Sequence, residues 1–163
     1  MRVDAYLKRL ITSSEFKKFK KKDGKAYLCA GFFVLDFETG KNLHQIDYYS
    51  PKNKKIATFI LDNEIQSKLS EGANKKKPEE LKGDIKLDLD KLRGIVGDEM
   101  KNQGITYNIH KIIAVIQNIE GKKVWILNCI TSDMGLIKAD IDDTTGNILK
   151  FEKINLFDSI RKL

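Results

Sequence analysis

The sequence predicts an α+β protein built from two helix-plus-antiparallel-meander halves that pack as one compact unit. Each half opens with apolar residues at helical spacing, continues with apolar or alternating segments of strand length, and contains a Thr-Gly turn. The chain has 163 residues, of which 41% are hydrophobic and 33% charged, a composition that excludes disordered and collagen-like proteins. A chain of this length buries enough surface to fold without a disulfide or a metal.

The first half is predicted over residues 1–71, with an αβββ order. Apolar side chains from Val3 to Phe19 recur at helical spacing, which predicts one helix over residues 2–22. Gly24 follows the lysine-rich last turn of this helix and is expected to end it.

The next segment, residues 26–37, is almost wholly apolar and rich in aromatic and β-branched residues. Such a strand is either buried on both faces or lies between a helix and a second sheet. Two further strands are predicted over residues 43–49 and 56–61. Asp62 is in position to cap a short helix that runs through Leu69.

Residues 72–87 are predicted to be a linker, because glycine, proline and a lysine triplet interrupt any helical or strand periodicity of the apolar residues there. The second half, residues 88–163, is predicted as αββββ. Its helix starts at Asp88 or Asp90 and ends at Gly104. The apolar face of this helix is formed by Leu89, Leu92, Val96 and Met100. The elements after it are strands over residues 105–119, 122–131, 135–142 and 148–154, and a short helix over 155–163.

Two glycines, Gly94 and Gly97, lie inside this second predicted helix. Each weakens a helix by about 1 kcal/mol relative to alanine. We therefore expect the helix to approach a sheet closely at these positions, which would compensate the loss.

The two halves share the turn sequence Asp-x-x-Thr-Gly, at residues 36–40 and 142–146. Duplication of one supersecondary unit explains this repetition. Independent use of the same turn chemistry in two hairpins explains it as well.

In the second half, the acidic turn Asp140-Ile141-Asp142-Asp143-Thr144-Thr145-Gly146-Asn147 follows a meander with Trp125 in its middle strand. With these features, residues 88–154 resemble a PepSY-type unit. Residues 1–70 resemble a divergent copy, which matches at the helix and at Asp36 to Gly40. The resemblance implies a cystatin-like fold, in which a helix lies across a curled antiparallel sheet. It also implies a binding, peptidase-inhibitory or regulatory role, and it carries over no catalytic residue.

The net charge of +7 is concentrated in residues 1–80, which hold 17 Lys and Arg against 11 Asp and Glu. Residues 81–163 hold 13 against 12. A basic patch is typical of phosphate-binding surfaces, whereas lysines also end helices and keep proteins soluble. Only four of the 30 basic residues are arginine, which reads phosphates and bases better than lysine does.

The candidate binding residues lie in the first predicted helix and around the turn near residue 51. They are Lys17, Lys18, Lys20, Lys21, Lys22, Tyr48, Tyr49, Lys52, Lys54 and Lys55. Consecutive strand residues point to opposite faces, so one of the two tyrosines is expected to meet solvent beside the basic turn. Aromatic side chains next to lysines can stack bases, although the sequence contains no RNP-like motif.

The acidic cluster of Asp140, Asp142 and Asp143 does not fit a calcium loop. Counted from Asp140, the sixth residue is Thr145 where glycine is needed, and the twelfth is Phe151 where glutamate is needed. We expect these aspartates to stabilise the turn.

Histidine and cysteine are too sparse to predict a metal site or a nucleophile. His44 and His110 lie in different halves, and Cys29 and Cys129 have no partner at zinc-ligand spacing. Both cysteines lie in apolar runs, as expected of unreactive core thiols. No Walker loop, G-x-S-x-G or G-x-G-x-x-G pattern is present.

These observations predict a non-enzymatic binding module for a protein or peptide partner, without cofactor or metal. The alternative is a nucleic-acid-associated protein that uses the basic first half, and a homodimer through exposed sheet edges is also considered. Charges in the N-terminal ten residues and the lack of a long apolar run predict no signal peptide and no membrane span. Unpaired cysteines favour a cytoplasmic location.

Overall fold

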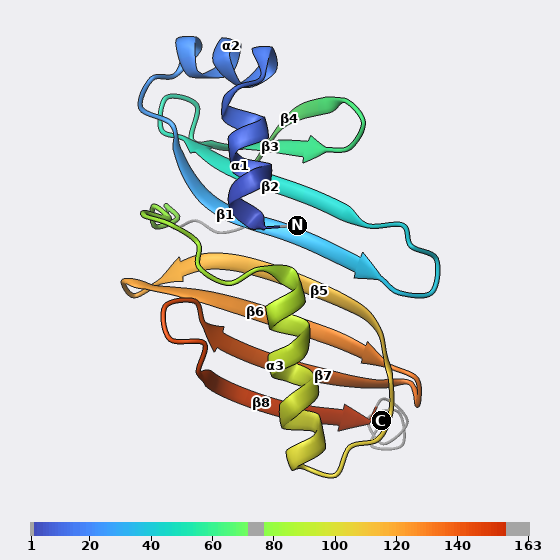
Figure 1. Cartoon of the computed structure of the whole chain (residues 1–163). Coiled ribbons are helices and arrows are strands. Elements are labelled where there is room, and N and C mark those ends of the chain that lie inside the picture. Colours follow the sequence, from blue (N-terminus) through green and yellow to red (C-terminus); the bar gives the residue numbers. More distant parts are fainter. Residues whose placement is uncertain (1, 72–76, 156–163) are drawn as a thin grey trace.

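In the computed structural model, which describes residues 2–71 and 77–155, an eight-stranded antiparallel sheet carries the described helices on one face (Figure 1). The strand order is β4-β3-β2-β1-β5-β6-β7-β8. Two meanders therefore meet at the centre of the sheet, where β1 and β5 pair. The predicted α+β class is confirmed.

The elements have the following bounds. The helices are α1 (Val3–Ile11), α2 (Ser14–Lys22) and α3 (Leu89–Asn102). The strands are β1 (Tyr27–Asp36), β2 (Leu43–Ser50), β3 (Lys55–Leu61), β4 (Ile65–Glu71), β5 (Ile109–Ile119), β6 (Lys122–Thr131), β7 (Gly135–Asp142) and β8 (Ile148–Asn155). The helix predicted over 155–163 falls mainly on residues 156–163, outside the described residues, and Asn155 ends β8.

The single helix predicted over residues 2–22 is wrong, because the chain breaks it at Thr12 and Ser13. The Ser13 hydroxyl accepts a hydrogen bond from the Phe16 amide at 3.2 Å and so caps α2. The Thr12 hydroxyl donates to the Lys8 carbonyl at 2.9 Å and closes the end of α1. The break lets α2 change direction while the apolar stripe of both helices still faces the sheet.

The helix predicted from Asp62 through Leu69 is also wrong, because this segment forms strand β4. Ile65 and Leu69 are four residues apart, a spacing that puts them on one face of a helix and equally on one face of a strand. Pairing with β3, from Leu61 opposite Ile65 to Lys55 opposite Glu71, decides between the two.

Helix α3 buries the predicted apolar face, Leu89, Leu92, Val96 and Met100. Asp88 caps it, because its carboxylate accepts from the Lys91 amide at 2.7 Å. The close approach expected at Gly94 and Gly97 is wrong: a Cβ at either position would meet nothing within 4 Å. Both glycines lie away from the sheet, so their loss of helix stability is not compensated by packing there.

In the described part of the predicted linker, residues 77–87, two side chains are anchored in the core while most of the others are exposed. Leu81 and Ile85 are 4% and 3% exposed, and the Leu81 amide donates to the Leu28 carbonyl at 2.8 Å. Residues 72–76 lie outside the described residues.

The two Asp-x-x-Thr-Gly turns have the same local hydrogen bonds. In each, the first aspartate accepts from two backbone amides, and the glycine has a positive φ, 71° at Gly40 and 75° at Gly146. Their places differ, since the Asp36 turn joins β1 to β2 whereas the Asp142 turn joins β7 to β8. The shared sequence therefore follows turn chemistry and does not mark equivalent positions of a repeat.

A buried carboxylate joins β6, the end of β7 and the segment that enters α3. Asp143 is 0% exposed and accepts from the amides of Lys86 and Leu87 and from the Trp125 indole, each at 2.9 Å. The Lys123 ammonium lies 4.0 Å away. This agrees with a structural role for the acidic turn: Asp142 forms the turn, and Asp143 fixes its neighbours.

We expect Asp143→Ala to lower the free energy of unfolding by about 2–4 kcal/mol, because it leaves the buried Trp125 indole N–H and the partly buried amides of Lys86 and Leu87 without their acceptor. Chemical denaturation followed by Trp125 fluorescence measures the loss. The control is Asp84→Ala at an exposed side chain, which should change stability by less than about 0.5 kcal/mol. Equal, small effects of the two substitutions would contradict the assigned role.

Helix α1 is held to the sheet by a ring pair. The Tyr6 hydroxyl and His44 Nε2 are 2.8 Å apart, and the two rings stack with centroids 4.3 Å apart. Burial lowers the pKa of His44 and raises that of Tyr6. A neutral imidazole can accept the tyrosine hydrogen bond, whereas a protonated one cannot.

Stability should therefore fall as the pH drops below about 6.5, the ordinary histidine pKa. With its pKa lowered by folding, His44 binds fewer protons in the native state than in the unfolded state, so acid favours unfolding. Thermal unfolding of wild type and His44→Gln between pH 7.5 and 5 tests this. The variant should show the weaker pH dependence in this window, and parallel curves would refute the expectation.

Candidate binding surface

The sheet face opposite the helices is the main candidate surface. Phe33 points into the core and is 0% exposed, so its neighbours Phe32 and Val34 point to the other face. Cross-strand pairs share a face, which places Val115 beside Phe32 and Ile113 beside Val34. No described helix lies on this side of the sheet (Figure 1).

Large apolar side chains continue across the three central strands of this open face. Ile126 of β6 pairs with Val115, and Ile130 of the same strand lies four residues along. We call the following set the central patch: Phe32, Val34, Ile113, Val115, Ile126 and Ile130. Every member is partly exposed.

Polar and charged side chains border the central patch on the same face. Gln45 of β2 lies opposite Phe32, and Asp140 of β7 pairs with Ile126. Asn128 lies within the patch, between Ile126 and Ile130 and opposite Ile113. Asp47 accepts a hydrogen bond from the Gln45 amide at 3.1 Å, and burial raises the pKa of its carboxyl. An apolar centre with a polar border is the usual anatomy of a protein–protein interface.

The size of the open face also suits an interface. Eight strands spaced about 4.8 Å apart, with a mean length of about 28 Å, give roughly 1,000 Å². A standard interface buries about 800 Å² on each partner. On the solvent-facing side of an antiparallel sheet the residues are normally polar. An apolar centre on such a face is therefore a candidate interaction site.

The structure brings the two predicted lysine clusters together at one corner. Lys22 at the end of α2 and Lys52 in the β2–β3 turn line the same cavity, of about 490 Å³. Asp23 lies between them, is 6% exposed and is bonded by the Ser50 hydroxyl, which lowers the pKa of its carboxyl. Lys17, Lys18, Lys21 and Lys54 are exposed, and Lys55 is partly exposed.

Two of the predicted binding residues have structural contacts instead. The Lys20 ammonium donates to the carbonyls of Ala26 and Gly24, at 2.5 and 3.2 Å, so it closes the end of α2. Tyr48 is 7% exposed and packs on Phe16, with ring centroids 4.9 Å apart. Burial raises the pKa of Tyr48 to about 12.

Tyr49 is the partly exposed member of the tyrosine pair, as predicted, but it lies on the open face of the sheet. Its ring contacts Tyr27 at 5.5 Å between centroids. The tyrosine therefore extends the open face and does not form one surface with the lysines of α2, which lies on the helix side.

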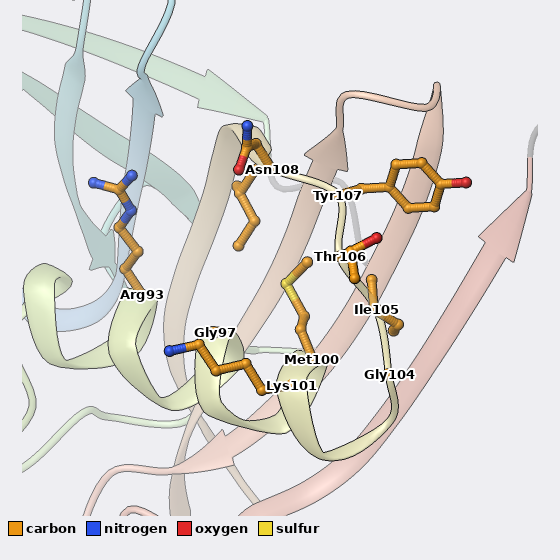
Figure 2. Close-up of a pocket in the computed structure, with 10 residues that line it drawn as sticks. Arg93, Gly97, Met100, Lys101, Gly104, Ile105, Thr106, Tyr107 and Asn108 are labelled. Atoms are coloured by element: carbon orange, nitrogen blue, oxygen red, sulfur yellow. The ribbon is translucent and has the colours of Figure 1, made fainter.

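A cavity of about 560 Å³ lies between α3 and the segment before β5 (Figure 2). Arg93 and Lys101 stand on its α3 side and Met100 lies between α3 and the segment, whereas Tyr107 points away from them. The Arg93 guanidinium is 3.9 Å from the centre of the Phe37 ring. The described residues that line this cavity include no carboxylate, imidazole or thiol.

The histidines and cysteines do not converge. Cys29 and Cys129 are buried free thiols, as predicted, and burial raises the pKa of each to about 12. His110 pairs with Glu38 at 2.8 Å, and His44 with Tyr6. Within residues 2–71 and 77–155, no group of three or more His, Cys, Asp or Glu side chains could hold a metal ion.

No family model and no curated protein matches the chain. Among solved structures, the fold is similar to that of a "putative lipoprotein" from Clostridium difficile 630. The likeness is one of fold alone. The TM-score is 0.59 at 13% identity, over 85% of this chain and 90% of that one. In the part of the chain that the structure describes, no helix is long and apolar enough to cross a membrane.

The central patch was missed as a site in the sequence, although its signal is present. In residues 26–37 the odd-numbered and the even-numbered positions are both mostly apolar, which predicts a strand covered on both faces. The structure covers one face only, so the prediction of burial on both faces is wrong. An apolar strand with an uncovered face is the feature that points to binding.

Proposed function

We propose that this protein is a non-enzymatic binding module whose open sheet face holds a folded protein partner. The observation that supports the proposal is the central patch, apolar and partly exposed at the middle of a face with a polar border. A broad sheet face fits the surface of a folded protein, because an extended peptide would contact only part of it. An inhibitory or regulatory role and a cytoplasmic location stay predictions.

The PepSY-type resemblance belongs to the same proposal. Helix α3 followed by β5–β8 has the order that the resemblance implies for residues 88–154, and α1 and α2 followed by β1–β4 have a related order. This order supports two halves of cystatin-like type, built as a helix layer on a meander. The two Asp-x-x-Thr-Gly turns join different pairs of strands in the two halves, β1 to β2 and β7 to β8, so they are not used as evidence of duplication.

The proposal is tested by making the central patch more polar while keeping its β-branched side chains. Ile113→Thr with Val115→Thr keeps β-branched side chains in β5 and therefore strand propensity. The matched control is Ile11→Thr with Leu149→Thr, which changes two exposed apolar residues outside the patch. We expect the patch variant to bind a purified partner at least about tenfold more weakly, a loss of about 1.4 kcal/mol, and the control to bind like wild type.

Partner and contact site are found together by photocrosslinking in the cell. Benzoylphenylalanine in place of Phe32 should give a defined adduct, and the same group in place of Asp98, exposed on α3, should not. An adduct with a second copy of this chain would replace the proposed partner with a homodimer. Adducts from both positions, or from neither, would refute the proposal.

Nucleic-acid binding is a second candidate function, favoured by the convergence of Lys22 and Lys52 at one cavity. We expect anisotropy of labelled single-stranded RNA to show affinity that falls with salt, with a log–log slope of about −0.7 per phosphate contact. Charge reversal of Lys17, Lys18 and Lys21 should weaken binding and leave the Tm unchanged, whereas Lys20 must be kept for its structural contacts. The absence of binding at low salt would dismiss this function.

A further inference from the structure

Strand β4 forms one edge of the sheet and is left open on its outer side. It pairs with β3 along its whole length, in a register without a bulge. Within the described residues it has no second neighbouring strand. Alternate N–H and C=O groups of β4 therefore point away from the sheet, where an added strand could pair with them.

The opposite edge, β8, has the features that normally block such pairing. Its register with β7 shifts between Asp140 and Ile141, and it carries three charged residues among eight. Neither edge strand contains proline, and β4 carries two charged residues among seven. Unlike β8, however, β4 has an unshifted register, and its Leu69 is 53% exposed. Edges are usually protected by bulges, charges or proline, so β4 is the less protected edge.

A groove of about 420 Å³ runs between β4 and α2 on the helix side of the sheet. Phe19 and Phe59 form its apolar floor, and Ser67 and Leu69 line it from β4. Phe59 is fully buried, whereas Phe19 is partly exposed at the groove. Side chains of a strand added to β4 would alternate, and every second one would point toward this groove.

The groove is bordered by cations. Lys18 and Lys22 line it from α2, where their four-residue spacing puts them on one face of the helix. Glu15 is the one carboxylate in the lining. Lys68 of β4 also lines the groove, but because Ser67 and Leu69 face it, strand alternation points the Lys68 side chain to the other face of the sheet. A ligand with an apolar side chain for the floor and carboxylates for the lysines complements this arrangement.

We propose that the β4 edge binds an extended acidic peptide segment as an additional strand. One apolar side chain of the peptide contacts Leu69 and the groove floor, and its carboxylates face Lys18 and Lys22. An extended peptide is favoured over nucleic acid because a strand edge offers alternating amides and carbonyls, and a phosphate backbone can accept from the amides but has no donor for the carbonyls. Neither α2 nor β4 contains an arginine.

The experiment is fluorescence anisotropy with four defined probes. The first is an octapeptide that alternates valine and glutamate. The second is an N-methylated form of this peptide, made as two variants that carry the methyl groups on alternate residues in one or the other register. The third is octaglutamate, and the fourth is a single-stranded DNA octamer. We expect the first probe to bind best, and at least one N-methylated register to lose about tenfold or more, because N-methylation removes edge hydrogen bonds and leaves side-chain charge intact.

Matched lysine variants test the position of the site. Lys18→Glu with Lys22→Glu should weaken the valine–glutamate peptide at least about tenfold. Lys17→Glu with Lys21→Glu makes the same charge change on the same helix, at residues that do not line the groove, and should cost less than about threefold. Circular dichroism and the Tm show that both variants are folded.

Three results would overturn the proposal. The first is no binding of the valine–glutamate peptide. The second is evidence that charge alone explains binding: octaglutamate binds as tightly as the valine–glutamate peptide, or N-methylation in neither register weakens binding. The third is tighter binding of the DNA, weakened equally by both lysine pairs, which would assign the corner to phosphate. The Ile113→Thr, Val115→Thr variant should keep peptide binding, so this outcome is separate from that of the open face.

Discussion

The pairing of β1 with β5 is the interaction on which the rest of the structure depends. Seven residue pairs, from Ala30 opposite Gln117 to Asp36 opposite Lys111, join the two meanders. Without this ladder, each meander would end in an unpaired apolar strand, an edge that invites aggregation. With it, the helices share one core with a continuous sheet, and the opposite face is also continuous. The central patch exists only because Phe32 and Val34 meet Val115 and Ile113 across this seam.

Strand alternation lets the same segment supply stability and a surface. Phe33 contacts Trp125 at 5.9 Å between ring centroids inside the core, and burial of such side chains contributes roughly 25 cal/mol per Å² of apolar area. Phe32 and Val34 gain much less, because their face of the sheet stays partly exposed. Folding alone would be served as well by threonine at those positions, which has high strand propensity and tolerates water. The apolar side chains at these positions are consistent with the binding that we propose for this face.

The sequence predicted elements whose signals are local and missed what long-range pairing decides. The apolar face of α3 and the Asp-x-x-Thr-Gly turns follow from spacing and turn chemistry within a few residues. The apolar spacing in residues 65–71 fits both a helix and a strand, and only pairing with β3 makes the segment a strand. The open face was missed for a related reason: an apolar run shows that a strand has two apolar faces but not whether a helix covers each. The positions of the lysines in the sequence predicted that their side chains are exposed. The contacts of Lys20 could not be predicted in this way, because they depend on where α2 ends.

The distribution of charge bears on whether two copies of the open β4 edge can pair with each other. Edge-to-edge pairing of two β4 strands would bring two copies of the α2 corner together, each with exposed Lys18 and Lys22. Like charges repel over about a Debye length, roughly 8 Å at physiological salt, so this corner opposes self-pairing and attracts an acidic strand. Natural sheets use charge at edges in this way to reject copies of themselves. In the two proposals, the lysines of the α2 corner select the sign of the partner's charge at the β4 edge, while the central patch relies on apolar contact.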